Sequence, residues 1–108
     1  MVKAIKANAG VNDYHKAIGW GKTEQTIKLS GKNRRLDIAD VEAQKGIEFK
    51  EYSSGRVYNS GDVKTEVLLD KKLVDTGWDI KWVFKGCSPS GPLEKSLKTA
   101  EIDIKIIP

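Results

Sequence analysis

The chain has 108 residues, 39% of them hydrophobic and 31% charged, which is the composition of one globular domain with a core of modest size. Its single cysteine excludes an intrachain disulfide, and no apolar run approaches the roughly 20 residues that cross a bilayer, so we expect a domain that works in a reducing, soluble compartment. The formal charge of +4 at pH 7 favours a polyanionic partner such as nucleic acid, although a mixed solvated surface accounts for this charge equally well.

The first predicted element is a helix within residues 7–19. Asn12 or Asp13 can cap it, and apolar residues follow at helical spacing. Two glycines then interrupt the pattern, and residues 23–29 either resume the helix or form an extended segment. The sequence leaves this choice open.

Two strands follow, because residues 34–40 and 46–52 alternate polar with apolar side chains. The short polar connection between them predicts a hairpin. A loop over residues 53–61 leads to a helix over residues 62–74, whose apolar residues share one broad helical stripe. Gly77 is expected to end this helix.

Alternate residues from 78 to 84 are large and apolar, whereas charged residues occupy most of the positions between them. This strand is therefore expected to pack one face on the core and to expose the other. A short helix over residues 93–100 and a last strand over residues 102–106 complete the chain. The order of elements predicts one domain spanning residues 1–108, of the α/β (α+β) class, with crossovers long enough for parallel strand pairing.

Three residues in the predicted hairpin carry the chemistry. Glu48 and Lys50 share one side of their strand because side chains alternate along it, and Asp37 in the preceding strand can approach Glu48 if the two strands pair. Two carboxylates are hard oxygen ligands for Mg²⁺, with Mn²⁺ or Zn²⁺ as alternatives. A metal held in this way can position a water and neutralise a phosphate, while Lys50 adds positive charge, so the sequence predicts phosphodiester hydrolysis.

The segment from Asp37 to Lys50 resembles the active-site motif of the PD-(D/E)xK, or restriction-endonuclease-like, nucleases. Asp37 matches the first acid of that motif, Glu48 the second acid and Lys50 the lysine, whereas Leu36 stands in place of the proline. The wider pattern, through a helix ending at Gly77 and a strand that carries tryptophans, is similar to the nuclease toxin domains of bacterial contact-dependent growth inhibition and related competition systems.

This resemblance implies a mixed central sheet flanked by helices and a metal-dependent endonuclease that hydrolyses DNA or transfer RNA, with DNA slightly favoured. It also implies a C-terminal toxin domain, delivered as part of a larger exported protein into the cytoplasm of a target bacterial cell. A cognate immunity protein is the implied partner. In the family an acid on the first helix often joins the metal site, and Glu24 best matches that place.

Several polar residues near the motif are candidates for substrate binding. Arg34 and Arg35 adjoin it and can bind phosphate, and the following loop offers Ser53, Arg56 and Tyr58 for contacts with a nucleic-acid backbone. Ordinary surface roles explain the same residues. The only histidine, His15, excludes a histidine-rich zinc site and is expected at the surface.

Other acid-x-lysine triplets begin at Asp62, Asp70, Asp79 and Asp103, so the triplet alone does not identify a nuclease. An exposed ion pair between Glu48 and Lys50 is the simplest alternative. The competing function is a non-catalytic nucleic-acid-binding or protein-interaction domain with the same fold. A purely structural interaction module predicts scattered basic residues and loss of polyanion binding at physiological salt.

Overall fold

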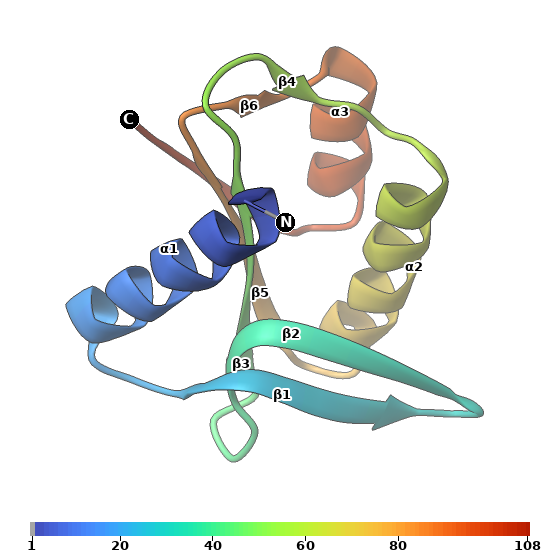
Figure 1. The fold of residues 1–108 in the computed structure, drawn as a ribbon. Helices are drawn as coiled ribbons and strands as arrows, with labels where there is room; N and C mark the ends of the chain where they lie inside the picture. Colours follow the sequence, from blue (N-terminus) through green and yellow to red (C-terminus); the bar gives the residue numbers. More distant parts are fainter. Residues whose placement is uncertain (1) are drawn as a thin grey trace.

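A five-stranded mixed sheet organises the chain, with helices on both of its faces (Figure 1). The computed structural model describes the backbone of residues 2–108 and the side chains from Gly10 onward. The elements, in chain order, are α1 (Val2–Ile18), β1 (Lys22–Leu29), β2 (Lys32–Asp40), β3 (Lys45–Glu51), β4 (Arg56–Val57), α2 (Gly61–Asp75), β5 (Asp79–Lys85), β6 (Ser88–Pro89), α3 (Gly91–Thr99) and β7 (Asp103–Ile107).

The sheet order is β1-β2-β3-β5-β7. The first three strands form an antiparallel meander, and β3, β5 and β7 then run parallel to one another. The predicted hairpin and the predicted parallel crossovers are therefore both confirmed. Residues 23–29 are extended rather than helical, and the short β4 and β6, which pair in parallel, have no counterpart in the sequence-based prediction.

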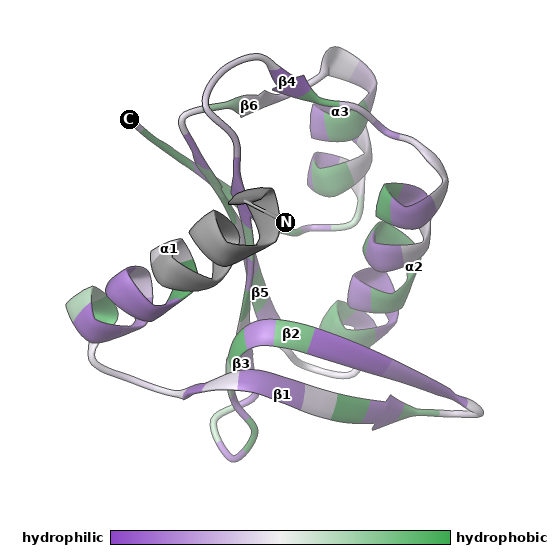
Figure 2. Cartoon of the chain, in the orientation of Figure 1, coloured by the Kyte–Doolittle hydropathy of each residue, from purple (hydrophilic) through white to green (hydrophobic). Residues whose placement is uncertain are grey.

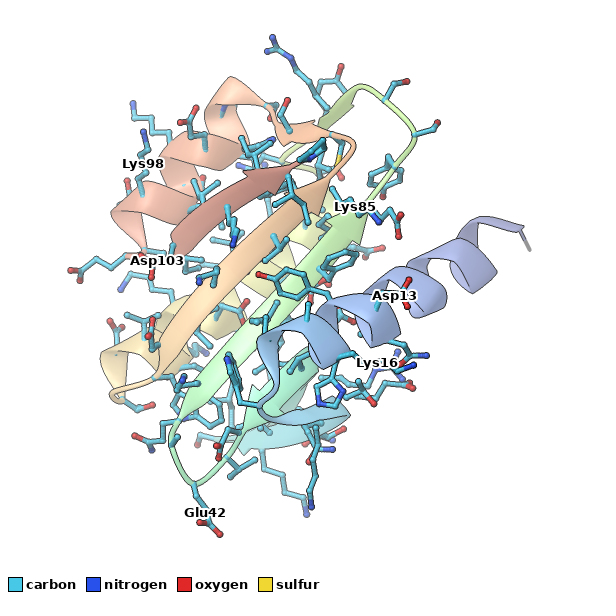
Figure 3. The ribbon with its side chains drawn as sticks, turned by 90° about the vertical axis from the view of Figure 1, so that its left-hand side faces the viewer. Asp13, Lys16, Glu42, Lys85, Lys98 and Asp103 are labelled. Carbon is cyan, nitrogen blue, oxygen red and sulfur yellow. The ribbon has the colours of Figure 1, made fainter. Side chains whose placement is uncertain are left out.

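Each face of the sheet has its own hydrophobic core. The helix α1 covers one face and packs on a cluster that includes Ile38, Ile47, Phe49 and Val83. Figure 3 views this side, with α1 crossing the sheet. The larger cluster lies under α2 and α3 on the other face. Figure 2 shows hydrophobic and hydrophilic residues interspersed along these two helices, as expected for helices with one buried side.

The central strand β5 is buried on both faces, which corrects the expectation of one solvated side. Ile80, Trp82 and Phe84 are buried towards α2 and α3 as predicted, but Val83 between them is also fully buried, in the core under α1. Only the start of the strand, at Asp79, is exposed. Burial on both faces is usual for a strand with parallel neighbours covered by crossover helices.

The helix α2 begins and ends close to its predicted bounds, and Gly77 follows it with a φ of 106°, a conformation that glycine adopts without strain. Its buried stripe differs from the prediction at two positions. Leu68 is 62% exposed, whereas Asp70 has no exposed surface at all. A buried carboxylate on the inner side of α2 is the feature that shapes the site described below.

We predict that Val83→Ala lowers the free energy of unfolding by about 2 kcal/mol, because it leaves a cavity between α1 and the sheet. The control Asp79→Ala, at the exposed start of the same strand, should change it by less than about 0.5 kcal/mol. Urea denaturation of both variants measures the difference. Equal, small losses would contradict the burial of β5 under α1.

Candidate functional site

The site lies where β2 and β3 separate. These strands pair only through Ile38–Asp40 and Lys45–Ile47, although both strands continue beyond those residues. From Glu48 onward, β3 pairs with β5 alone. Polar side chains from β2 and from α2 occupy the region beside the unpaired side of β3, and one of them, Asp37, bonds to a backbone N–H that β2 leaves free there.

Asp37 turns into this region because β2 loses its regular alternation. Leu36 belongs to the core under α2 and Ile38 to the core under α1, although residues two apart in a strand normally share one face. Opposite Asp37, Glu24 of β1 has a φ of 52°, and these two residues do not pair although their neighbours do. The Asp37 Oδ2 atom accepts a hydrogen bond of 2.7 Å from the backbone N–H of Phe49, the residue between Glu48 and Lys50.

Glu48 and Lys50 share the α2 side of β3, while Ile47 and Phe49 face α1, as the alternation predicted. Both side chains are largely buried, with exposed fractions of 7% for Glu48 and 15% for Lys50. Their charged groups approach to 3.0 Å. The exposed ion pair considered as an alternative is therefore absent at this position, since this pair is inside the molecule.

Two further acids come from α2, four residues apart and hence on one side of that helix. Glu66 Oε1 lies 2.8 Å from Lys50 Nζ, and Glu66 is the more exposed of the two acids, at 26%. Asp70 is fully buried and accepts a hydrogen bond of 2.8 Å from the indole N–H of Trp82. Sequence reasoning assigned Asp70 only to the helix. Its position three residues after the buried Val67 was the available signal, because that spacing places it on the buried stripe.

Arg34 of β2 connects the two sets of acids. Its Nη2 atom donates to Glu48 Oε1 at 3.0 Å, and its Nε atom donates to Asp70 Oδ1 at 2.8 Å. A longer contact of 3.8 Å joins Arg34 Nη1 to Glu66 Oε2. The guanidinium is only 5% exposed, so these contacts lie in a poorly solvated environment and are stronger than the same pairs at a surface.

The pKa values of the two cations are raised. Burial acts to lower the pKa of Arg34, but its hydrogen bond with Asp70 and the nearby carboxylates outweigh that effect. Burial likewise acts against the Lys50 ammonium, and the charges of Glu48 and Glu66 raise its pKa above the ordinary range. Both side chains therefore stay charged at neutral pH.

The pKa values of three of the acids are raised as well, which favours their neutral forms. Burial raises the pKa of Asp70 despite its bonds with Arg34, and burial together with the charge of Glu48 raises the pKa of Glu66. The same two causes raise the pKa of Asp37 to about 7, against the hydrogen bond from Phe49 and the charges of Lys50 and Arg34. Four carboxyl groups share two cations here, so the cluster has an excess of negative charge when all are ionised.

The residues predicted to bind substrate do not lie together beside Asp37, Glu48 and Lys50. Arg34, expected at the substrate phosphate, lies inside the molecule with its guanidinium engaged by carboxylates. Arg35 points to solvent and approaches Glu24 at 3.6 Å, with both side chains about two-thirds exposed. Glu24 is on β1 rather than on the first helix, and its exposed side chain does not join the cluster.

The loop candidates Ser53, Arg56 and Tyr58 are all exposed beyond the end of β3. His15 is half-buried at the end of α1, where its Nε2 atom is 2.7 Å from the carbonyl oxygen of Gly21 and so helps to fix the start of β1. Among the competing acid-x-lysine triplets, only the one that begins at Asp70 contributes a residue to the buried cluster.

The donor set for a metal is limited. Within the described side chains, no group of three or more His, Cys, Asp or Glu residues is arranged to hold a metal ion. A site here would use the two carboxylates of Asp37 and Glu48, each of which has more acceptor positions than its contacts occupy. Water and a phosphate oxygen would supply the other ligands, as is usual for Mg²⁺.

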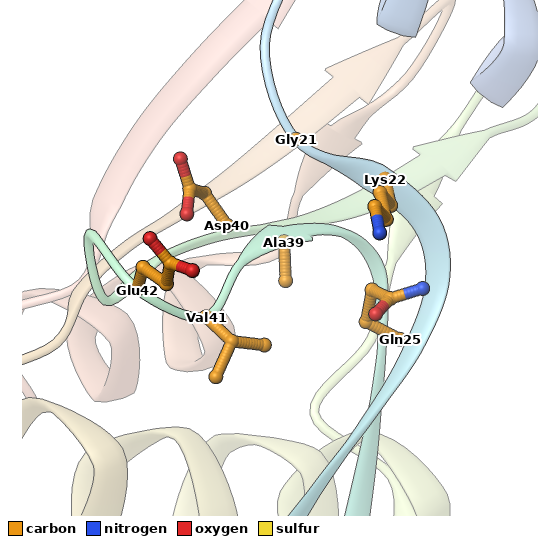
Figure 4. A pocket seen from close by; sticks show the side chains of 7 residues that line it. All are labelled: Gly21, Lys22, Gln25, Ala39, Asp40, Val41 and Glu42. Atoms are coloured by element: carbon orange, nitrogen blue, oxygen red, sulfur yellow. The ribbon is translucent and has the colours of Figure 1, made fainter.

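A separate hollow of about 300 Å³ lies between the start of β1 and the β2–β3 turn (Figure 4). It is lined by Gly21, Lys22, Gln25, Ala39, Asp40, Val41 and Glu42. It shares no residue with the buried cluster, and Figure 3 places Glu42 at the outer tip of the turn. This hollow therefore does not form the entrance to the candidate site.

No helix in the described part of the chain combines the length and apolar character needed to cross a membrane. Comparisons with models of protein families, with curated proteins and with solved structures found no match to this chain. The site must therefore be interpreted from its own geometry.

We predict that Asp70→Ala lowers the free energy of unfolding by about 3 to 5 kcal/mol, because it removes a partner of a buried guanidinium. Asp75→Ala is the matched control, since Asp75 is on the same helix but pairs with Lys71 at the surface. That variant should lose less than about 1 kcal/mol. Urea denaturation measures both variants, and similar losses would argue against a critical buried ion pair.

A second prediction concerns pH. Asp37 has an ordinary pKa of 3.8 and a folded-state pKa of about 7, so the folded chain keeps a proton that the unfolded chain releases. The contribution of Asp37 to the free energy of unfolding is complete below about pH 4. It falls by about 4 kcal/mol as the pH rises to about 7. Denaturation in chelator should show this decline in the wild type and a flatter profile in Asp37→Asn. A difference between the two proteins that stays constant from pH 4 to 8 contradicts the assignment.

Proposed function

We propose that this protein is a metal-dependent endonuclease with a restriction-endonuclease-like fold, in which Asp37, Glu48 and Lys50 act on a phosphodiester bond. The observation that carries the proposal is the convergence of these three residues where β2 and β3 separate. A mixed sheet flanked by helices, as the resemblance implied, supports the fold assignment.

The charge balance supports binding of a divalent cation. Four acidic side chains and only two basic ones lie together, three of them buried, and burial together with the charge of Glu48 raises the pKa of Asp37 to about 7. A cation between Asp37 and Glu48 would remove that repulsion and take the place of the proton. Mg²⁺ suits these hard oxygen donors best, and Mn²⁺ or Zn²⁺ are alternatives.

Each residue has a distinct role in the proposed reaction. When bound, the metal would supply Lewis-acid activation of the phosphate and of a water. Asp37 and Glu48 hold their carboxylates at fixed positions, Asp37 through Phe49 and Glu48 through Arg34. Lys50 places a permanent positive charge 3.0 Å from Glu48, where it can stabilise the charge that develops on the phosphate.

The biological setting of the proposal follows the resemblance. The domain would act as the C-terminal toxin of a larger exported protein, would cleave DNA or transfer RNA in the cytoplasm of a target bacterial cell, and would be neutralised by an immunity protein in the producing cell. The formal charge of +4 supports a nucleic-acid substrate because it attracts phosphates at long range.

One observation favours the non-catalytic alternative. Both oxygens of Glu48 already have cationic partners, Arg34 at 3.0 Å and Lys50 at 3.0 Å. A purely structural ion-pair cluster would have the same contacts. The two functions differ in whether removing the charge of Glu48 abolishes a chemical reaction or only weakens the fold.

We predict that purified protein nicks plasmid DNA or cleaves total RNA with Mg²⁺ or Mn²⁺ and not with chelator. Glu48→Gln and Lys50→Met should each lower the cleavage rate by 100-fold or more, as a rough expectation for losing a preorganised charged group at the reaction centre. Asp79→Asn and Lys81→Met are matched controls from another acid-x-lysine triplet, outside the cluster, and should cleave at the wild-type rate.

Circular dichroism and urea denaturation must show that the Glu48 and Lys50 variants remain folded. Full activity in both folded variants would reject these catalytic residues. An inactive wild-type protein with both nucleic acids and with every metal would instead support the non-catalytic alternative.

A further inference from the structure

A shallow pocket of about 560 Å³ lies beside the small β4–β6 ladder and the start of α3. Figure 1 shows these elements together at one end of the molecule. Its lining residues are Arg56, Tyr58, Asn59, Ser90, Gly91 and Pro92. The parallel pairing of β4 with β6 fixes one wall of the pocket, since Arg56 pairs with Ser88 and Val57 with Pro89. The volume is within the range of ordinary small-molecule sites.

Two side chains of this wall face outward. Val57 is 5% exposed and belongs to the core under α2 and α3, so strand alternation directs its neighbours Arg56 and Tyr58 away from the core. Tyr58 is 66% exposed, more than any other large hydrophobic side chain in the described part of the chain. Within those same residues, Arg56 makes no ion pair. An exposed aromatic ring and a cation without an ion-pair partner therefore lie two residues apart, on a segment that the pairing of β4 with β6 holds in place.

Asn59 adds an unsatisfied polar atom. Its Nδ2 atom donates a hydrogen bond of 3.2 Å to Ser96 Oγ on α3, which fixes the amide, but its Oδ1 atom is buried and has no hydrogen-bond partner. A buried acceptor without a donor is unfavourable. A ligand N–H group would satisfy it once the Asn59 amide turns towards the pocket, and every nucleobase has such a group on its Watson–Crick edge.

We propose that this pocket binds one unpaired nucleotide of a single-stranded nucleic acid, with its base stacked on Tyr58 and its phosphate beside Arg56. Aromatic stacking together with a nearby cation is the usual means by which proteins bind single strands. A base within a duplex is stacked on its neighbours and cannot present its face to a tyrosine. The substrate class is therefore single-stranded nucleic acid or an unpaired segment of a folded one.

This inference rests on the proposed nuclease function for the identity of the ligand. The pocket is close to the candidate site along the chain, because the segment between Lys50 and Arg56 spans at most about 20 Å. The helix α2, which carries Glu66, begins at Gly61, two residues after the pocket residue Asn59. A strand that crosses the reaction centre can thus place a nucleotide a few positions away in the pocket.

Fluorescence anisotropy tests the proposal with the full chain in chelator, so that no cleavage occurs. The probes are labelled ten-nucleotide strands of one mixed sequence, as DNA, as RNA and as the DNA duplex. Tyr58→Ala should weaken binding of the single strands about tenfold or more, whereas Tyr58→Phe, which keeps the ring, should stay within about twofold of wild type. Arg56→Gln should weaken binding and reduce its salt dependence.

Two controls separate the pocket from general surface effects. Leu68→Ala removes a similarly exposed apolar side chain from α2, and Lys98→Gln removes one exposed positive charge from the last turn of α3. Both should bind single strands within about twofold of wild type. A preference for DNA or for RNA in the wild type, lost in Tyr58→Ala, identifies which single strand the pocket accepts.

Several results would overturn the proposal: single-strand binding that Tyr58→Ala leaves unchanged, equal losses in Tyr58→Ala and Leu68→Ala, or tighter binding of the duplex. The readout is independent of catalysis. Tyr58-dependent binding by a protein that cleaves nothing would support the pocket and count against the nuclease. Metal-dependent cleavage without any effect of Tyr58 would support the nuclease and reject the pocket.

Discussion

The guanidinium of Arg34 lies between the sheet and α2 and binds one carboxylate from each, Glu48 on β3 and Asp70 on the helix. A buried charge that loses a partner costs several kcal/mol, so these three groups hold one another in place. Trp82 adds a second donor to Asp70 from β5. The position of Glu48 is thereby coupled to the packing of α2 on the sheet, which is how a small domain can hold a charged side chain rigidly near its core.

The same cluster creates the electrostatic condition for the proposed activity. Arg34 and Lys50 stay charged, yet they are outnumbered by acids, and burial together with the charge of Glu48 raises the pKa of Asp37 to about 7. A carboxyl group whose pKa is raised beside another carboxylate can exchange its proton for a divalent cation. The separation of β2 from β3 makes this possible, because a continuous ladder would have paired the backbone N–H of Phe49 and left Asp37 facing elsewhere. The exposed loop beyond β3 is where the remainder of the proposed nucleic-acid substrate would lie.

Much of the architecture was predictable because the signals were local. Alternation placed Glu48 and Lys50 on one side of β3, and Gly77 marked the end of α2 correctly. The failures involve interactions between distant segments. Val83 appeared to belong to a charged, solvated face until α1 covered it. Arg34 and Asp70 are charged residues of a kind that is normally solvated, and only their pairing across 36 positions of sequence explains their burial. The turn of Asp37 towards β3 depends on an irregularity in β2 that no periodicity encodes.

The central claim is that Asp37 and Glu48 share a divalent cation. Anomalous diffraction from crystals of the protein grown with Mn²⁺ tests it directly, because the anomalous signal locates manganese independently of any assumed ligands. The account predicts one strong peak within coordination distance of an oxygen of Asp37 and an oxygen of Glu48, with Lys50 alongside. Crystals that contain manganese only elsewhere, while these two carboxylates keep their ion pair and hydrogen bond unchanged, would contradict it.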